Sequence, residues 1–304
     1  MKIKKIALIG MGAVGTVYGS ILNDRYSEDF AVITGKSRKE KLQNHGFTLN
    51  GKTFHPNIFC ENDNNVKFDL IFFCVKNYQL EEAIEDVKSF VDENTILISL
   101  LNGVTARERI TAAYPNNPVL YGLVTKINAE RTENGVINTE NGEIHFGQAD
   151  NTAISPAVEA VLECFNEAGI KNIVFPNMIR MTWMKFMLNV GVNQVSAVTG
   201  ASYGKVTSIN SNLTLFREAM IEVLAIAKAS NIDLRQEDIE GFVTSIGSFS
   251  PNGRTSMLQD IQAKRQTEVD YFAGTVVEMG KTLNIPTPVN HVLYCVIKSL
   301  EQLY

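Results

Sequence analysis

Hydrophobic and polar positions change their pattern near the middle of the chain. In the first half, short apolar runs alternate with segments of helical period, which predicts strands at 3–9, 31–34, 68–75 and 95–101. We expect helices between them, at 13–23, 37–45 and 79–90. The run from Phe68 to Val75 is almost entirely apolar, as is typical of a parallel strand covered on both faces. The alternation predicts a Rossmann-type α/β domain with a mostly parallel sheet.

Residues 119–148 depart from this alternation. Their segments alternate around Asn-Gly pairs at 134–135 and 141–142, and such pairs are typical of tight hairpin turns. We therefore expect an antiparallel hairpin at the far edge of the sheet. A helix at 154–168 and a short strand at 173–175 should follow it.

Beyond Pro176 nearly all of the chain has helical period. The expected helices are 178–197, 209–230, 236–246, 255–282 and 289–303. The pattern predicts two domains, a Rossmann-like domain over residues 1–176 and an all-α domain over residues 177–304. A chain of 304 residues is long enough for both.

Composition excludes several classes of protein. Hydrophobic residues make up 45% of the chain and charged residues 20%, as in ordinary globular proteins, and a net charge of −5 gives no nucleic-acid footprint. No apolar run reaches the roughly 18 residues of a membrane span. The four cysteines lie far apart, so we expect reduced thiols and a cytoplasmic location. Neither the cysteines nor the histidines have the spacing of metal ligands, so we expect no metal.

A glycine-rich turn joins the first strand to the first helix. Gly10-Met11-Gly12-Ala13-Val14-Gly15 has the G-x-G-x-x-G spacing of dinucleotide-binding turns. The first glycine allows the tight turn, the second admits a pyrophosphate and the third lets helix and strand pack closely. We expect Gly10, Gly12, Ala13, Val14 and Gly15 to bind the dinucleotide, with its phosphates at the helix N-terminus.

The end of the second strand bears on which dinucleotide is bound. NAD sites usually carry an acid there that bonds the ribose 2′-hydroxyl, and no acid occurs from Ala31 to Lys39. Lys36 and Arg38 would instead neutralise a 2′-phosphate, which favours NADP(H) over NAD(H). The same two charges also fit a merely solvated helix start.

Polar residues follow two further strands. Lys76 comes after the strand at 68–75 and Asn102 after the strand at 95–101. Ligands of such sheets bind at the carboxyl ends of the strands, so we expect both residues beside the dinucleotide. In isolation each would be a solvated or capping residue.

An apolar segment of the second domain carries a polar stripe. Lys185, Asn189 and Asn193 are spaced by four, which places them within roughly 80° of one another on a helix. Burying an unpartnered lysine is costly, so the stripe either pairs across the interior or faces the cleft between the domains. In the second case Lys185 has a lowered pKa and serves as a proton donor.

A second polar stripe lies in the helix expected at 255–282. Ser256, Asp260, Lys264 and Glu268 again recur every four residues. Taken alone, this spacing fits a solvent-exposed face with ion pairs between successive turns.

These motifs occur in one order, and together they resemble the ketopantoate reductase (2-dehydropantoate 2-reductase) family. The resemblance covers essentially the whole chain. The stretches that carry it are the glycine turn, Val75-Lys76, Leu101-Asn102-Gly103, the Lys185 stripe and 256–270. The family commonly has an arginine near the end of the second strand, where this chain has Gly35-Lys36.

The resemblance implies NADPH-dependent reduction of 2-dehydropantoate to pantoate, in pantothenate and coenzyme A synthesis. The first domain would bind NADP(H) and the second would carry the substrate and catalytic groups. Lys185 would be the general acid. Glu268 would help to orient the lysine or the substrate and would also bind the cofactor.

The remaining carried-over roles concern binding. Asn189, Asn193 and Ser256 would bind the hydroxyl and carboxylate of the substrate. Asn102 would lie between cofactor and substrate, and Lys76 would reach the cofactor. The expected partner is a small keto acid, with the enzyme a monomer or a homodimer. A related reductase of another small 2-keto acid and a non-catalytic dinucleotide-binding regulator remain the alternatives.

Overall fold

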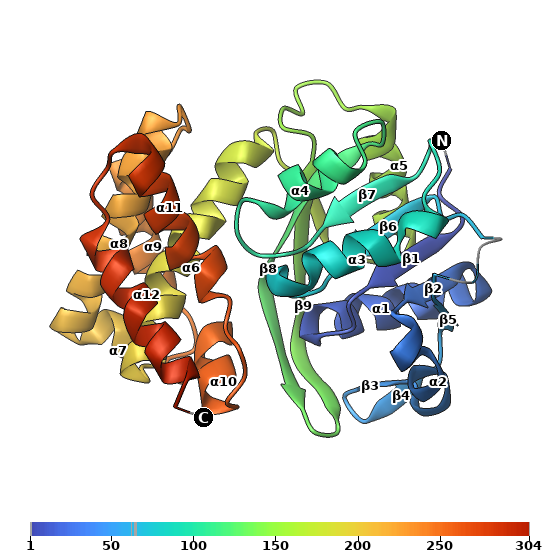
Figure 1. The fold of residues 1–304 in the computed structure, drawn as a ribbon, viewed down its shortest axis with the longest axis horizontal. Coiled ribbons are helices and arrows are strands. Elements are labelled where there is room, and N and C mark those ends of the chain that lie inside the picture. The colour runs from blue at the N-terminus through green and yellow to red at the C-terminus, as the bar shows by residue number, and fades with distance from the viewer. Residues whose placement is uncertain (1, 62, 64–65, 304) are drawn as a thin grey trace. The chain divides into compact units, whose positions relative to one another are not determined.

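The chain forms two compact units, with the boundary between Ile179 and Arg180. The structure is a computed structural model that describes residues 2–61, 63 and 66–303 (Figure 1). In the part of the chain that it describes, no helix has the length and apolar character needed to cross a membrane.

Parallel strands form the centre of the first unit. They run in the order β5-β2-β1-β6-β7-β8, and every neighbouring pair among them is parallel. Their bounds are β1 Ile6–Ile9, β2 Phe30–Ile33, β5 Asn57–Phe59, β6 Leu70–Phe73, β7 Ile96–Ser99 and β8 Val119–Thr132. This order confirms the predicted Rossmann-type sheet.

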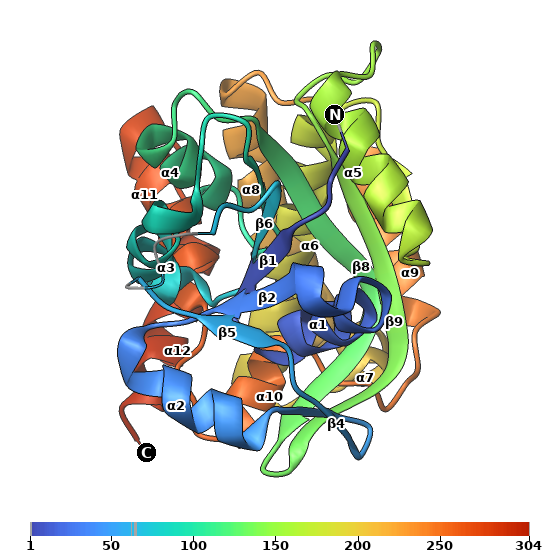
Figure 2. The same cartoon turned by 90° about the vertical axis from the view of Figure 1, so that its right-hand side faces the viewer.

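Helices cover both faces of the parallel strands, which explains their uninterrupted apolar runs. Ile6 and Leu8 of β1 join one hydrophobic cluster, which includes side chains of α1 and α5, while Ala7 and Ile9 join the other, which includes those of α3 and α4. Figure 2 shows α1 and α5 on one side of β1 and β6, and α3 and α4 on the other. The helices of this unit are α1 Ala13–Tyr26, α2 Lys36–His45, α3 Leu80–Asp86, α4 Ala106–Ala113 and α5 Pro156–Glu167, with short 3-10 turns η1 Ser27–Asp29, η2 Asn77–Gln79 and η3 Lys88–Phe90.

The antiparallel hairpin is present but does not form the edge of the sheet. β8 pairs along its length with β9 (Gly135–Gly147), and β9 also pairs with β3 (Phe47–Leu49) and β10 (Asn172–Val174), while β4 (Lys52–Phe54) pairs with β3. The expected edge position is therefore wrong.

The two Asn-Gly pairs behave differently. Gly135, at the start of β9, has φ +125° and follows the hairpin turn, as predicted. Gly142 has φ +73° but lies inside β9, where it bends a continuous strand rather than ending one.

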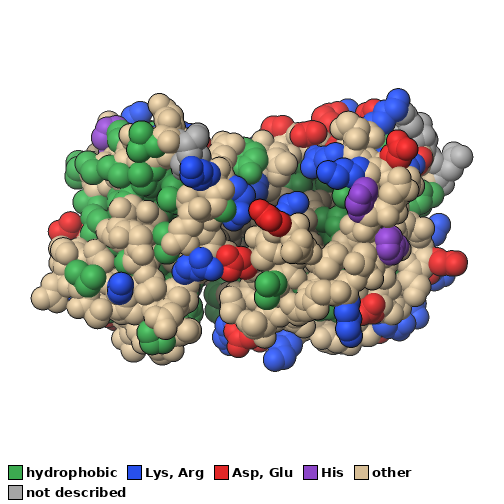
Figure 3. Space-filling view, turned by 90° about the horizontal axis from the view of Figure 1, so that it is seen from below, with side chains coloured by type: hydrophobic (Ala, Val, Ile, Leu, Met, Phe, Trp, Pro, Cys, Tyr) green, Lys and Arg blue, Asp and Glu red, His purple; other side chains and the backbone are tan. Residues whose placement is uncertain are grey.

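The second unit is helical throughout its regular structure. Its elements are α6 Met178–Thr199, α7 Tyr203–Ser208, α8 Asn210–Ala229, α9 Gln236–Gly247, α10 Ser256–Gln262, η4 Val269–Tyr271, α11 Ala273–Leu283 and α12 Pro288–Glu301. Hydrophobic side chains gather at the left of the view in Figure 3. Several large hydrophobic side chains of the second unit are exposed. They include Ile209, Ile221, Phe249, Val292 and Val296.

A buried polar network joins four of these helices. Gln194 of α6 donates to Asn290 of α12 at 3.1 Å, and Asn290 donates to the Glu222 carboxylate of α8 at 2.7 Å. Glu222 also accepts the backbone N–H groups of Val289 and Asn290, and so satisfies donors at the start of α12. Gln194 accepts the N–H of Ala273, the first residue of α11, at 3.2 Å.

The helix expected at 255–282 is interrupted, so that prediction is wrong. α10 ends at Gln262, and Lys264 has φ +53°, which a right-handed helix does not contain. The Arg265 guanidinium pairs with the Asp260 carboxylate at 2.9 Å. The backbone N–H of Arg265 donates to the Asp260 carbonyl and closes the turn. α11 begins only at Ala273.

The left-handed conformation of Lys264 predicts that glycine at this position does not destabilise the protein, as it would inside a helix. Lys264→Gly should leave the free energy of unfolding unchanged or raise it, because glycine adopts the left-handed conformation without strain. Lys264→Val should lower it by about 1–2 kcal/mol. Urea denaturation of the two variants measures both effects. A loss of about 1 kcal/mol for Lys264→Gly, as in an intact helix, would contradict the interruption.

Candidate active site

The glycine turn between β1 and α1 has the geometry of a phosphate cradle. Gly10 has φ +100°, and a Cβ there would lie 2.4 Å from the backbone nitrogen of Val75. A Cβ at Gly15 would lie 2.0 Å from the Gly10 carbonyl oxygen, so only glycine allows this close approach. A Cβ at Gly12 would meet nothing within 4 Å, so the backbone faces open space at that point.

The first turn of α1 is suited to an anion. Gly12 is its N-cap and has no side chain with which to cap the helix, and its first turn carries no acidic residue. The backbone N–H groups at Ala13 and Val14 belong to the helix end that favours negative charge. The predicted binding residues of this turn therefore fit a pyrophosphate.

Strand register brings Lys76 and Asn102 to the same edge as the glycine turn. Ile9 of β1 is in register with Phe73 of β6, which in turn is in register with Ser99 of β7. The three segments that follow these residues therefore leave the sheet side by side. The Asn77 side chain donates to the Asn102 carbonyl at 2.9 Å and joins two of them. Lys76 and Asn102 are both partly exposed.

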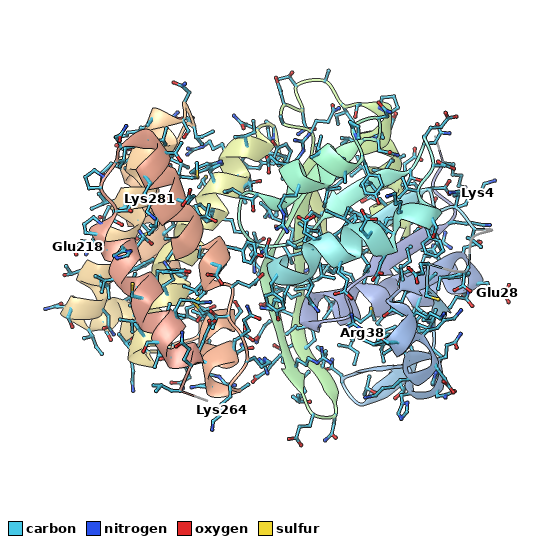
Figure 4. The ribbon with its side chains drawn as sticks, viewed as in Figure 1. Lys4, Glu28, Arg38, Glu218, Lys264 and Lys281 are labelled. Carbon is cyan, nitrogen blue, oxygen red and sulfur yellow. The ribbon has the colours of Figure 1, made fainter. Side chains whose placement is uncertain are left out.

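Charges of both signs surround the end of β2. Lys36 and Arg38 lie exposed in the first turn of α2, and Figure 4 labels Arg38 there. Lys39 is taken up by an ion pair with Asp63 at 2.7 Å. The basic residues predicted for the 2′-phosphate are thus accessible on this helix.

Two carboxylates of α3 also approach the end of β2, and sequence reasoning missed them. A Cβ at Gly35 would lie 3.7 Å from a carboxylate oxygen of Asp86 and 3.8 Å from one of Glu82. Burial raises the pKa of Asp86, the negative charges of Glu82 and Glu61 add to this, and Arg38 opposes it. The absence of an acid on β2 itself therefore does not leave this region free of negative charge.

The Lys185 stripe lies on one continuous helix, α6, as predicted. Lys185 and Asn189 are half-buried, and Asn193 is 5% exposed. Neighbouring side chains of α6, among them Phe186 and Met187, are buried in the unit. Burial lowers the pKa of the Lys185 ammonium to about 8, while the negative charge of Glu268 raises it and partly offsets that effect.

Glu268 and Ser256 do not share a helix, contrary to the expectation of one stripe. Ser256 is exposed at the first residue of α10. Glu268 lies outside both α10 and α11, in the segment that leads into η4, and is only 5% exposed. The structure couples Glu268 electrostatically to Lys185. Asp260, predicted on the same stripe, pairs instead with Arg265.

All four cysteines are free, and burial raises the pKa of Cys74, beside the glycine turn. Within residues 2–61, 63 and 66–303, no cluster of three or more His, Cys, Asp or Glu side chains has the geometry of a metal site.

Comparison with known proteins assigns the class. The family model described as "Ketopantoate reductase PanE/ApbA" matches residues 6–151, and the model for the C-terminal part of that family matches residues 177–301. The chain therefore belongs to the ketopantoate reductase family, whose members are oxidoreductases.

Individual relatives resemble the chain over nearly its whole length. A 2-dehydropantoate 2-reductase of Pyrococcus horikoshii is 28% identical over 98% of both chains. The structure of a 2-dehydropantoate 2-reductase from Methylococcus capsulatus is 25% identical, with a TM-score of 0.83 over 98% of this chain and 97% of that one. A D-mandelate dehydrogenase, solved with NADH and anilino(oxo)acetate, has a TM-score of 0.87 at 22% identity over 98% and 99%. The last likeness concerns the fold alone.

Proposed function

We propose that the protein reduces 2-dehydropantoate to pantoate with NADPH. The observation that carries the proposal is Lys185, a half-buried lysine on an apolar helix whose pKa is lowered to about 8 beside the Glu268 carboxylate. Such an amine is still largely protonated near neutrality and gives up its proton more readily than an exposed lysine. Family membership supports a keto acid as the substrate.

A nicotinamide dinucleotide held by the glycine turn would supply the hydride for the keto carbon. As negative charge builds on the keto oxygen, the Lys185 ammonium stabilises it and transfers its proton to that oxygen. The product leaves as an alcohol, and Lys185 regains a proton from solvent. Glu268 favours the charged form of Lys185 before each turnover, because its carboxylate raises the pKa of that lysine.

Binding roles follow the placement of the remaining residues. The backbone from Gly10 to Gly15 would hold the pyrophosphate, and Lys76 and Asn102, at the same sheet edge, would contact the dinucleotide. On α6, Asn189 and Asn193 share the stripe with Lys185 and bind the hydroxyl and carboxylate of the substrate, together with Ser256. Pantothenate synthesis in the cytoplasm, by a monomer or a homodimer, is part of the same proposal.

The preference for NADPH rests on Lys36 and Arg38. Both are exposed at the start of α2, where a 2′-phosphate would lie beyond the end of β2. The carboxylates of Glu82 and Asp86 near Gly35 favour a second candidate, an NADH-dependent reductase of another 2-keto acid. A phosphate close to them would be repelled, whereas a ribose hydroxyl would find acceptors.

Turnover itself is the first prediction from the proposed function. When the protein is mixed with NADPH and 2-dehydropantoate, NADPH should be oxidised. The loss of absorbance at 340 nm measures the rate. Lys185→Ala should lower kcat by about 10²–10⁴ while leaving NADPH affinity nearly unchanged, because the amine acts on the substrate oxygen.

Lys281→Ala is the matched control, since Lys281 projects from the exposed end of α11 (Figure 4). It should keep the full rate. NADPH binding without turnover of any keto acid would instead identify a regulator, and full activity of Lys185→Ala would reject the proposed acid.

The second prediction concerns pH. Reduction needs protonated Lys185, so kcat should fall as the pH rises through about 8. Because the Glu268 carboxylate raises the pKa of Lys185, Glu268→Gln should move this fall to lower pH. Steady-state rates between pH 6 and 10 give both profiles. An unchanged profile in Glu268→Gln would show that this carboxylate does not control the proton donor.

The third prediction separates the two dinucleotides. Replacing Lys36 and Arg38 together with alanine should weaken NADPH binding by at least about tenfold and NADH binding far less, because only NADPH carries the 2′-phosphate. Fluorescence titration of each dinucleotide measures the dissociation constants. Lys41→Ala, also exposed on α2, serves as the control. Equal losses for both dinucleotides, or tighter binding of NADH by the unaltered protein, would favour the second candidate.

A further inference from the structure

The segment that carries Glu268 has no regular structure of its own to fix it. α10 ends six residues before Glu268, and η4 begins only at Val269. A loop residue in such a place would ordinarily be mobile, since conformational entropy opposes one fixed position. Glu268 is nevertheless 5% exposed. Contacts on both sides of it account for this order.

On its N-terminal side the segment is bound to the end of α12. Thr267 is completely buried, and both its backbone N–H and its hydroxyl donate to Glu301, at 2.7 and 2.6 Å. The same hydroxyl accepts the N–H of Val269 at 3.2 Å. A single threonine side chain therefore spans Glu268 and ties the turn to α12.

On its C-terminal side the segment is bound to the same helix again. One carboxylate oxygen of Asp270 accepts the hydroxyl of Tyr294 at 2.9 Å, and the other accepts the Lys298 ammonium at 3.1 Å. Lys298 also pairs with Glu301 at 3.1 Å. Tyr294, Lys298 and Glu301 are spaced by four and three residues, so they share one face of α12.

We name this set the α12 clamp: Thr267 and Asp270 on the Glu268 segment, with Tyr294, Lys298 and Glu301 on α12. Its bonds form one chain from Thr267 through Glu301 and Lys298 to Asp270. Each of these contacts joins two residues of the second unit. Downstream of the clamp, the side chain of Gln194 on α6 accepts the N–H of Ala273.

We propose that the α12 clamp is the positioning device for the reaction, and that its five residues fix the Glu268 carboxylate relative to Lys185 without touching substrate or cofactor. The proposal rests on the function proposed above for these two groups. Hydrogen-bonded and charged contacts on both sides of one residue define its position more narrowly than apolar packing would. A small displacement of a group that acts on the proton donor lowers the rate sharply, since misplacement by about 1 Å can reduce the rate by about 10²-fold.

Thr267→Val tests the clamp with the least change of shape. The substitution removes the hydroxyl but keeps the branched side chain, whereas Thr267→Ser keeps the hydroxyl. We expect Thr267→Val to lower kcat by about ten- to a hundredfold with little change in KM. It should also move the high-pH fall of kcat toward that of Glu268→Gln. Thr267→Ser should restore both.

A double-mutant cycle separates positioning from general stability. In a Glu268→Gln background the carboxylate is already gone, so adding Thr267→Val should have almost no further effect on kcat. A purely structural role predicts the opposite result, with the two losses multiplying and the pH profile of Thr267→Val unmoved. Either of those two results would overturn the proposal.

Lys298→Met provides a second route if Thr267→Val does not fold. It should shift the pH profile in the same direction, because it releases Asp270 and Glu301 together. Two exposed residues supply matched controls, Lys281→Met on α11 and Glu218→Gln on α8, both labelled in Figure 4. These variants should keep the unaltered profile, and a shift in either of them as large as that of Lys298→Met would overturn the proposal.

A measurement without substrate distinguishes failure of the clamp from failure of the proposed function. The titration of Lys185 in the free protein can be followed by NMR of ¹⁵N-labelled lysine side chains, assigned with Lys185→Arg. Thr267→Val should lower this pKa toward its value in Glu268→Gln. If Glu268→Gln lowers it and Thr267→Val does not, the clamp proposal fails alone. If Lys185→Ala retains full turnover, the proposed function fails independently of the clamp.

Discussion

The attraction between the Lys185 ammonium and the Glu268 carboxylate is the interaction on which the chemistry proposed for the helical unit depends. Burial alone destabilises the protonated form of Lys185. The negative charge of the Glu268 carboxylate restores part of the stability of that form. Neither contribution is sufficient alone, because a fully solvated lysine holds its proton too tightly and a buried, isolated one has lost it. The intermediate value near 8 requires both an apolar helix and a fixed negative charge.

The two units meet their chemical requirements in different ways. In the first, the dinucleotide features arise from consecutive residues, since one turn supplies the tight bend at Gly10 and the open backbone at Gly12. In the second, Lys185 and Glu268 are more than 80 residues apart in the sequence. Their proximity depends on long-range contacts, including the buried network of Gln194, Asn290 and Glu222. The dinucleotide site can therefore be recognised from a local motif, whereas the pairing of Lys185 with Glu268 depends on how the helices pack.

Much of the fold and many of the candidate residues could be predicted from the sequence because they have local causes. The apolar run Phe68–Val75, the glycine turn and the spacing of Lys185, Asn189 and Asn193 are each recognisable within a dozen residues, and β6, α1 and α6 form where expected. The three-residue strands β3, β4 and β5 are too short to show a period and were not predicted, although β10, of the same length, was expected at 173–175.

The errors share one cause, which is that tertiary contacts prevail over local preference. Ala263, Lys264, Arg265 and Gln266 are all good helix formers, so a continuous helix was the natural expectation. The chain leaves the helix there because Arg265 pairs back to Asp260 and Thr267 bonds Glu301. Likewise, nothing near β2 in the sequence announces the carboxylates of Glu82 and Asp86, which reach Gly35 from another helix.

The interruption between α10 and α11 also has a consequence for biosynthesis. A helix can form as soon as its own residues leave the ribosome, but the Glu268 segment needs partners on α12, about 30 residues further along the chain. Under the proposed role of the α12 clamp, a nascent chain that already contains Lys185 and Glu268 cannot hold this carboxylate in place until α12 has emerged and docked. The pKa of Lys185 would therefore reach its final value only once the helical unit has folded.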